Sequence, residues 1–324
     1  MNEALKKVDT YAAIFGQMKN RFRWRVSDSR ILMMAASLYV TSERDFDLQR
    51  FDELSEFIKD EVGMFSTLKH QERFTIAAML DTRFEAPKDK LHEFLSIYED
   101  LKDTGFHRSV YTYIAAMVAL SGEKHHKESV PLAFSIYKKM KEHHFFLTGQ
   151  DDYPLAMLLA QGDQDTDELM DQIEGYYRKL NGAGFRKGNE LQSMSHILSL
   201  QDEVAQDEMV NRCSQLFQIM KQGGMKAKAM HYPQIALLSF LEDAKARLAQ
   251  LEEIWERLNS EKLFKWHKDI NMLMAVQFLI TEQIEHSSML STSLYTTMET
   301  LIQAQQAASV AAISGAAAAA AASN

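Results

Sequence analysis

The sequence predicts an all-α protein built as a right-handed α-solenoid of about seven helical hairpins, each about 40 residues long, with N- and C-terminal capping helices. Three observations lead to this fold class. The strong helix formers Leu, Ala, Met, Glu, Gln and Lys dominate the 324 residues. Only 13 glycines and 4 prolines are present, too few for a fold with many tight turns. Finally, several residue types recur with a period near 40, which is typical of stacked helical repeats.

The repeat is clearest as a two-residue step at the end of the longer amphipathic segments. Gly105-Phe106 and Gly184-Phe185 lie 79 residues apart, which is two periods. The full set of steps is Gly63-Met64, Gly105-Phe106, His144-Phe145, Gly184-Phe185, Gly224-Met225 and Leu263-Phe264. An aromatic residue precedes most of them by eight or nine positions (Tyr98, Tyr137, Tyr177, Phe217 and Trp255). We expect each glycine to end a helix in the left-handed conformation, with the next apolar residue folding back on the last turn.

A second set of recurring residues is small, and its spacing is 38 to 42 residues. Its members are Ala35, Ala77, Ala115, Ala156, Ser195, Ala236 and Ala275. A helix pressed between two neighbours needs a small residue where the backbones approach, so we expect this set on the first helix of each hairpin. The predicted hairpins are 22–65, 66–106, 107–146, 147–185, 186–225, 226–264 and a degenerate one from 265. Residues 2–20 are expected to cap one end, and residues from 287 to about 308 to close the other.

Proline placement agrees with these boundaries, because proline is tolerated in the first turn of a helix. Pro87 and Pro131 are expected to open second helices, and Pro154 and Pro233 to open first helices. The sequence therefore predicts one helical repeat domain over residues 1–305, followed by an Ala-rich, low-complexity tail over 306–324.

The segment "KNRFRWRVSDSR" at 19–30 is the most unusual part of the sequence. Arg21, Arg23 and Arg25 alternate with Phe22 and Trp24, a pattern that can hold a phosphate or a base by charge and stacking. The alternative, which we favour, is that the two aromatic residues plug the first hairpin while the arginines pair with the acidic body. The net charge of −9 also argues against a general nucleic-acid binder.

No catalytic residue, cofactor site or metal site is predicted, because phosphate-binding glycine loops, zinc motifs and nucleophile elbows are absent. The lone Cys213 fits a reducing compartment, and the chain has no long apolar stretch or signal-like N-terminus. We therefore expect a cytoplasmic protein with no membrane partner. Its oligomeric state is not predicted.

The leading functional interpretation is a non-enzymatic scaffold that binds a protein or peptide in a concave groove lined by first helices. Aromatic anchors often dominate such interfaces, and the candidates here are Tyr111, Tyr113, Tyr153 and Tyr232. Two alternatives stay open. One is an enzyme on a closed α/α toroid, which a ring with inward-pointing Asp, Glu or His would favour. The other is nucleotide or RNA binding through residues 19–30.

The segments "FRWRVSDSRILMMAASLYV" (22–40) and "TGFHRSVYTYIAAMVAL" (104–120) resemble a bacterial, mainly Bacillales, family of uncharacterised proteins, the domain of unknown function family 4003. The resemblance covers about residues 1–305. It implies a bacterial cytosolic protein with no assigned activity, and it transfers no functional residues. The hairpins are also similar to tetratricopeptide and HEAT-like repeats, although the tetratricopeptide signature is missing.

Overall fold

The structure is a computed structural model that describes residues 3–42, 44–64, 66–201, 203–286, 301, 302 and 305. Within these residues it contains fourteen α-helices and three short 3₁₀ helices, and no strand. The predicted all-α class is therefore confirmed. The 3₁₀ helices span Thr67–Lys69, Gln150–Asp152 and Ala229–His231.

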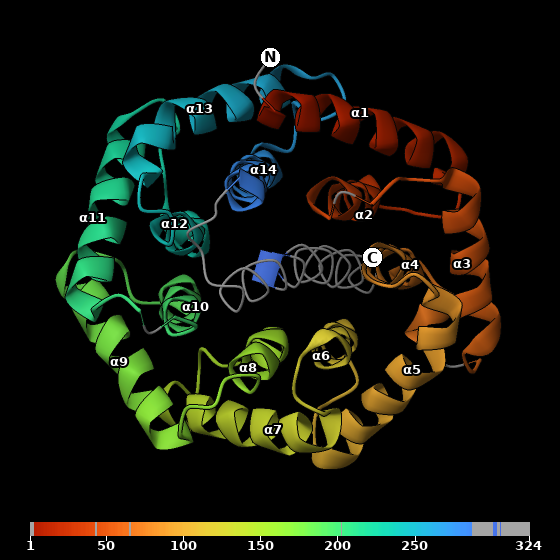
Figure 1. Cartoon of the computed structure of the whole chain (residues 1–324), viewed down its shortest axis with the longest axis horizontal. Helices are drawn as coiled ribbons and strands as arrows, with labels where there is room; N and C mark the ends of the chain where they lie inside the picture. The colour runs from red at the N-terminus through yellow and green to blue at the C-terminus, as the bar shows by residue number, and fades with distance from the viewer. Residues whose placement is uncertain are drawn as a thin grey trace, which may run out of the picture.

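The α-helices alternate between an outer and an inner layer of one ring (Figure 1). The outer helices are α1 (Glu3–Phe22), α3 (Leu48–Glu61), α5 (Pro87–Thr104), α7 (His126–His143), α9 (Thr166–Gly182), α11 (Gln206–Gln222) and α13 (Ala244–Ser260). The inner helices are α2 (Ser29–Thr41), α4 (Glu72–Arg83), α6 (Val110–Ser121), α8 (Tyr153–Leu159), α10 (Asn189–Leu198), α12 (Tyr232–Ser239) and α14 (Lys268–His286). Each outer helix packs on the inner helix that follows it in the chain.

The recurring small residues all lie on the inner helices, one on each. All are fully buried: Ala35, Ala77, Ala115, Ala156, Ser195, Ala236 and Ala275. Each inner helix is pressed between its outer partner and neighbouring inner helices, as the contacts of α6 with α8 and of α10 with α12 show. A larger side chain at these positions would push the helices apart, so the predicted packing role of this set is confirmed.

The predicted glycine caps are present at two of the steps. Gly105 (φ 123°) and Gly184 (φ 98°) take the left-handed conformation that favours glycine. The N–H groups of Phe106 and Phe185 then donate to the carbonyl five residues back, both at 3.1 Å. The other described steps end their helices without a left-handed residue, so the cap prediction is correct only at these two.

Three of the four prolines lie where they were expected. Pro87, Pro154 and Pro233 occupy the first turns of α5, α8 and α12. The expectation for Pro131 is wrong, because α7 begins five residues earlier, at His126, and encloses the proline.

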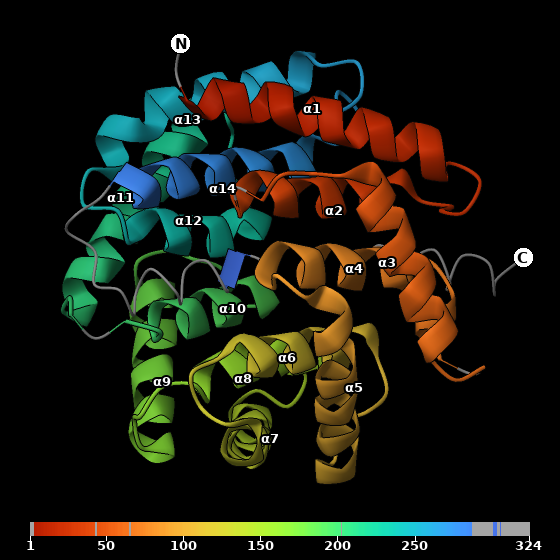
Figure 2. The ribbon, with the colours of Figure 1, turned by 45° about the vertical axis from the view of Figure 1, so that its right-hand side comes forward.

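The ring is closed by its first helix. α1 packs against α2 on one side and against α13 and α14 on the other (Figures 1 and 2). At this seam the Tyr11 ring stacks on Phe264 with 4.5 Å between centroids, and the Arg257 guanidinium donates to Asp9 at 2.9 Å. The helix expected over residues 2–20 is present as α1, but it contacts both ends of the row of hairpins and so does more than cap one end. A small rotation between successive repeats accumulates into curvature, which here brings the two ends together. The handedness of the stack stays a prediction.

The described residues near the C-terminus lie inside the ring (Figure 1). Leu301 and Ile302 are buried, and the Gln277 side chain of α14 donates to the Ile302 carbonyl at 3.4 Å. The remainder of the expected closing segment and the Ala-rich tail lie outside the described residues.

The inner helices run along the axis of the ring, where Figure 1 views them nearly end-on, so the ring has two edges. We call the described parts of the loops that precede the inner helices the N-terminal rim: residues 23–28, 62–71 without Phe65, 105–109, 144–152, 183–188, 223–231 and 261–267. We call the described parts of the loops that follow inner helices the C-terminal rim: residues 42–47, 84–86, 122–125, 160–165, 199–205 and 240–243, without Glu43 and Asp202.

One hydrogen bond recurs around the N-terminal rim. In each case a residue of one loop bonds a residue at the start of the next inner helix. The pairs are Ser27–Gln71, Ser66–Tyr113, His107–Tyr153, Thr148–Gln192 and Arg186–Tyr232. On the C-terminal rim, Arg44 pairs with Glu85 and Lys124 with Asp163, both at 3.0 Å. The repeated bond therefore holds five of the N-terminal rim loops against the next repeat, and each of the two ion pairs joins two neighbouring loops of the C-terminal rim.

Candidate functional site

The two rims carry opposite charge. The N-terminal rim contains ten Lys and Arg against four Asp and Glu, a net of +6. The described C-terminal rim contains two Lys and Arg against nine Asp and Glu, a net of −7. The protein as a whole carries −9. The N-terminal rim is therefore basic on an acidic protein, and the net charge of the whole sequence does not reveal this.

The N-terminal rim also gathers the exposed apolar side chains. Seven large apolar residues are exposed in the described chain, and six of them lie in this rim: Trp24, Met64, Phe145, Phe146, Met230 and Trp266. The seventh, Ile219, lies on α11. The rim loops make up only about a sixth of the chain. Scattered exposed apolar residues are ordinary, but a concentration on one edge marks an interaction surface.

The two exposed tryptophans flank the seam of the ring. Trp24 is 87 % exposed in the loop after α1, and Trp266 is 82 % exposed in the loop after α13. The backbone fixes both outward, because Phe22 and Val26 are buried on either side of Trp24 and Phe264 is buried just before Trp266. The tryptophans are therefore presented by anchored loops.

On another part of the rim, Phe145 and Phe146 lie between two residues, His144 and Thr148, whose polar side chains bind the body of the protein. His144 lies at hydrogen-bond distance from Glu174 (2.8 Å), and its ring packs on Tyr177. On the other side of the two phenylalanines, the Thr148 hydroxyl accepts a hydrogen bond from Gln192. Phe146 is consequently 95 % exposed although its neighbours are tethered.

In the structure, the side chains of the segment at residues 19–30 fall into two groups. Arg21 and Arg25 both bind the Asp52 carboxylate, at 2.6 and 2.7 Å, so they pair with the body as expected. Phe22 is buried, as the plug interpretation requires, but Trp24 is exposed and lies under the Arg23 guanidinium at 5.2 Å. Arg23 and Trp24 are therefore the part of this segment that faces outward.

Three of the four candidate contact tyrosines are buried. Tyr113, Tyr153 and Tyr232 are buried at the starts of inner helices, where their hydroxyls make the recurring rim bond. Tyr111 is only partly buried, and burial raises its pKa to about 12. The buried three are supports for the rim loops. The exposed aromatic side chains that the sequence reasoning missed are Trp266, Phe145 and Phe146.

One carboxyl group of the N-terminal rim is unusual. Asp152 is buried and accepts a hydrogen bond from the Gly149 N–H at 2.9 Å. Burial, and then the charge of Asp151, raise the pKa of Asp152 to about 7. A carboxyl with a raised folded-state pKa keeps its proton where the unfolded chain has lost it. Its contribution to stability is therefore complete below pH 3.8 and is lost as the pH rises towards 7.

We expect Asp152→Asn, which is neutral at every pH, to gain stability relative to the parent as the pH rises from 4 to 8. The gain has an upper bound on the order of 4 kcal/mol, from 1.36 kcal/mol for each pKa unit. Urea unfolding at several pH values measures it. Asp163→Asn, in the exposed C-terminal rim, is the control and should show no such trend. A constant difference between Asp152→Asn and the parent would contradict the assignment.

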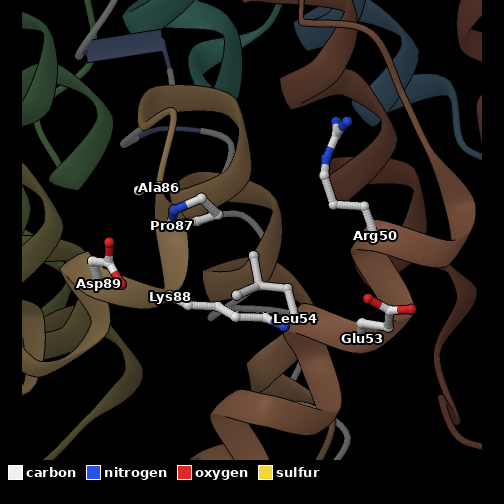
Figure 3. A pocket seen from close by; sticks show the side chains of 7 residues that line it. All are labelled: Arg50, Glu53, Leu54, Ala86, Pro87, Lys88 and Asp89. Carbon is white, nitrogen blue, oxygen red and sulfur yellow. The ribbon is translucent and has the colours of Figure 1, made fainter.

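A cavity of about 210 Å³ lies between α3 and the start of α5 (Figure 3). Arg50, Glu53, Lys88 and Asp89 supply two charges of each sign to its lining, so the cavity has no preference for an anion or a cation. The Arg50 guanidinium is also engaged with Asp81, at 2.8 Å. We assign no ligand to this cavity. In the described part of the chain, no three His, Cys, Asp or Glu side chains are grouped so as to hold a metal ion.

Comparison with known proteins places the chain in a family. The family model described as "Protein of unknown function (DUF4003)" matches residues 14–307. The chain is 38% identical over 312 residues to "Uncharacterized protein YeaA" of Bacillus subtilis (strain 168), covering 95% of this chain and 94% of that protein. No solved structure matches. The resemblance seen in the sequence is therefore confirmed, and the chain belongs to the DUF4003 family.

Proposed function

We propose that this is a non-catalytic binding protein, a ring of about seven helical hairpins that docks an acidic partner surface through its N-terminal rim. The observation that carries the proposal is the coincidence, on one edge, of a +6 charge and six of the seven large apolar residues that are exposed in the described part of the chain. Charge attracts and orients a partner, and exposed apolar side chains supply the area that becomes buried on binding.

This proposal keeps the scaffold role predicted from the sequence but moves the docking surface. A concave groove lined by inner helices would use the four candidate tyrosines as contacts. Tyr113, Tyr153 and Tyr232 are buried, and only Tyr111 is partly exposed. The rim loops, in contrast, expose both charged and apolar groups. A cytoplasmic location remains part of the proposal.

The two alternatives have less support. A toroid enzyme was expected to show a closed ring with inward-pointing Asp, Glu or His. The ring is closed, but the described residues inside it include the apolar Leu301 and Ile302, which are buried. Nucleotide or RNA binding through residues 19–30 would draw on Arg21 and Arg25, which are already paired with Asp52.

The proposal predicts that the protein is retained on immobilised poly-L-glutamate at pH 8 and low salt, although its own net charge is −9. Lys226→Glu/Lys228→Glu, which reverses two exposed rim lysines, should elute at clearly lower salt. The matched control is Lys88→Glu/Lys245→Glu, which makes the same charge change beside the C-terminal rim and should elute with the parent. Passage of the parent through the column without retention would contradict an acidic partner.

A further inference from the structure

We propose that the acidic surface docked by the N-terminal rim is an anionic lipid bilayer, which the ring meets edge-on. This inference rests on the proposed function and names its partner. The sequence analysis expected no membrane partner because the chain has no long apolar stretch. None of the described helices has the length and apolar character needed to cross a bilayer. Contact with a bilayer surface, however, requires no spanning helix.

The distribution of the apolar side chains favours a flat partner. They come from five of the seven rim loops, those after α1, α3, α7, α11 and α13, and so lie around the whole ring. A folded protein partner is usually held by a compact cluster of anchors at the centre of one patch. A bilayer, in contrast, contacts all the loops of one edge at once. The recurring hydrogen bond from five of the seven loops to the next repeat keeps these loops in register for such contact.

The side chains themselves are of the kind that prefers the lipid interface. Trp24 lies under Arg23 at 5.2 Å, Trp266 under Lys265 at 5.0 Å, and Phe145 near Lys141 at 5.6 Å. Tryptophan and phenylalanine enter the boundary between headgroups and acyl chains, while lysine and arginine remain among the lipid phosphates. The pairs therefore place an inserting group and a phosphate-binding group side by side.

The charge of the molecule fixes the orientation. With +6 on the N-terminal rim and −7 on the described C-terminal rim, an anionic surface attracts the first edge and repels the second. A second copy of the chain is a poorer occupant. Its C-terminal rim offers the opposite charge but exposes no large apolar side chain in its described residues, so the six apolar groups would find no apolar counterpart.

The test is flotation of the full chain with vesicles of phosphatidylcholine containing phosphatidylglycerol, compared with vesicles of phosphatidylcholine alone. We expect binding to the anionic vesicles that is roughly tenfold stronger or more. Tryptophan emission should shift to the blue on binding. Trp24 and Trp266 are exposed in solution, whereas Trp255, the third tryptophan, already packs against the core.

Two variants separate the roles of the rim. Trp24→Ser/Trp266→Ser should weaken binding to the anionic vesicles roughly tenfold and abolish the emission shift. Lys226→Glu/Lys228→Glu should weaken it at least as much and make it less sensitive to salt. The controls are Ile219→Ser, which removes the one exposed large apolar group off the rim among the described residues, and Lys88→Glu/Lys245→Glu. Both controls should bind like the parent.

The outcomes distinguish this inference from the function it rests on. If the protein is retained on poly-L-glutamate but does not float with anionic vesicles, the bilayer is overturned and an acidic protein partner stands. If the protein binds poly-uridine but no vesicles, the bilayer is also overturned, and the acidic partner is then a nucleic acid. If it binds neither vesicles nor polyanion, both proposals fail. Vesicle binding that survives Trp24→Ser/Trp266→Ser unchanged would also overturn the bilayer docking proposed here.

Discussion

Phe264→Ala is expected to open the ring at its seam. Phe264 is fully buried, and its ring stacks on Tyr11 at 4.5 Å and packs against Phe15 at 5.4 Å, both on α1. Truncating a buried phenylalanine to alanine costs about 3–5 kcal/mol, from lost burial and the cavity left behind. At the seam this loss falls on an interface that only noncovalent contacts hold together, since α1 and α13 are at opposite ends of the chain.

Hydrogen exchange of the α1 amides measures the opening. The matched control is Phe185→Ala, which removes the equivalent step residue inside the ring, where Phe185 packs against Phe217 and Tyr232 at 5.1 and 4.8 Å. Both variants should lower the free energy of unfolding by similar amounts. Only Phe264→Ala should accelerate exchange selectively in residues 3–22. Equal protection of α1 in the two variants would show that the seam is not a separate unit.

Arg50→Met is expected to destabilise the protein by about 3–5 kcal/mol, because it leaves a buried carboxylate without its cation. Asp81 on α4 is fully buried, and both its oxygens accept hydrogen bonds from Arg50 Nε, at 2.8 and 3.0 Å. The Tyr39 hydroxyl donates to the same group at 2.8 Å, and burial raises the pKa of Tyr39 well above its ordinary value. The tyrosine supplies a hydrogen bond but no positive charge.

Urea unfolding of two further variants checks this explanation. Adding Asp81→Asn to Arg50→Met removes the unpaired charge and should restore most of the stability. Arg44→Met breaks an ion pair with Glu85, whose side chain is 93 % exposed, and should cost less than about 1 kcal/mol. If Arg50→Met and Arg44→Met cost the same, the burial of Asp81 would not be what makes its ion pair important.

The alternation of the helices could be predicted from the sequence, because this alternation depends on local patterns. The small residue set marks every inner helix, and Gly105 and Gly184 mark two helix ends through their left-handed backbone. Closure of the ring could not be predicted from the sequence, since it depends on a small rotation between repeats that accumulates around the ring. No residue pattern near α1 shows that Tyr11 will meet Phe264, more than 250 residues later.

The docking surface was only partly predictable for a related reason. Arg23-Trp24 stood out as an unusual pair, but sequence could not tell a plugging tryptophan from an exposed one. Lys265-Trp266 repeats the same cation-aromatic order in the corresponding loop, and that repetition was a usable signal. The burial of Tyr113, Tyr153 and Tyr232 could not be predicted either, because an aromatic residue at the start of an inner helix suits a partner contact and a buried support equally well.

The seam has a consequence for synthesis of the protein. Tyr11 and Phe15 are synthesised about 250 residues before Phe264, which packs on both of them in the folded protein. At 5–20 residues per second, part of the apolar face of α1 stays uncovered for roughly 10–50 s. During that interval the nascent chain is an open arc with two unsatisfied ends, and neighbouring chains on one messenger can join end to end. In a ring of this design, part of the apolar face of α1 therefore stays open to such contacts until Phe264 has been synthesised.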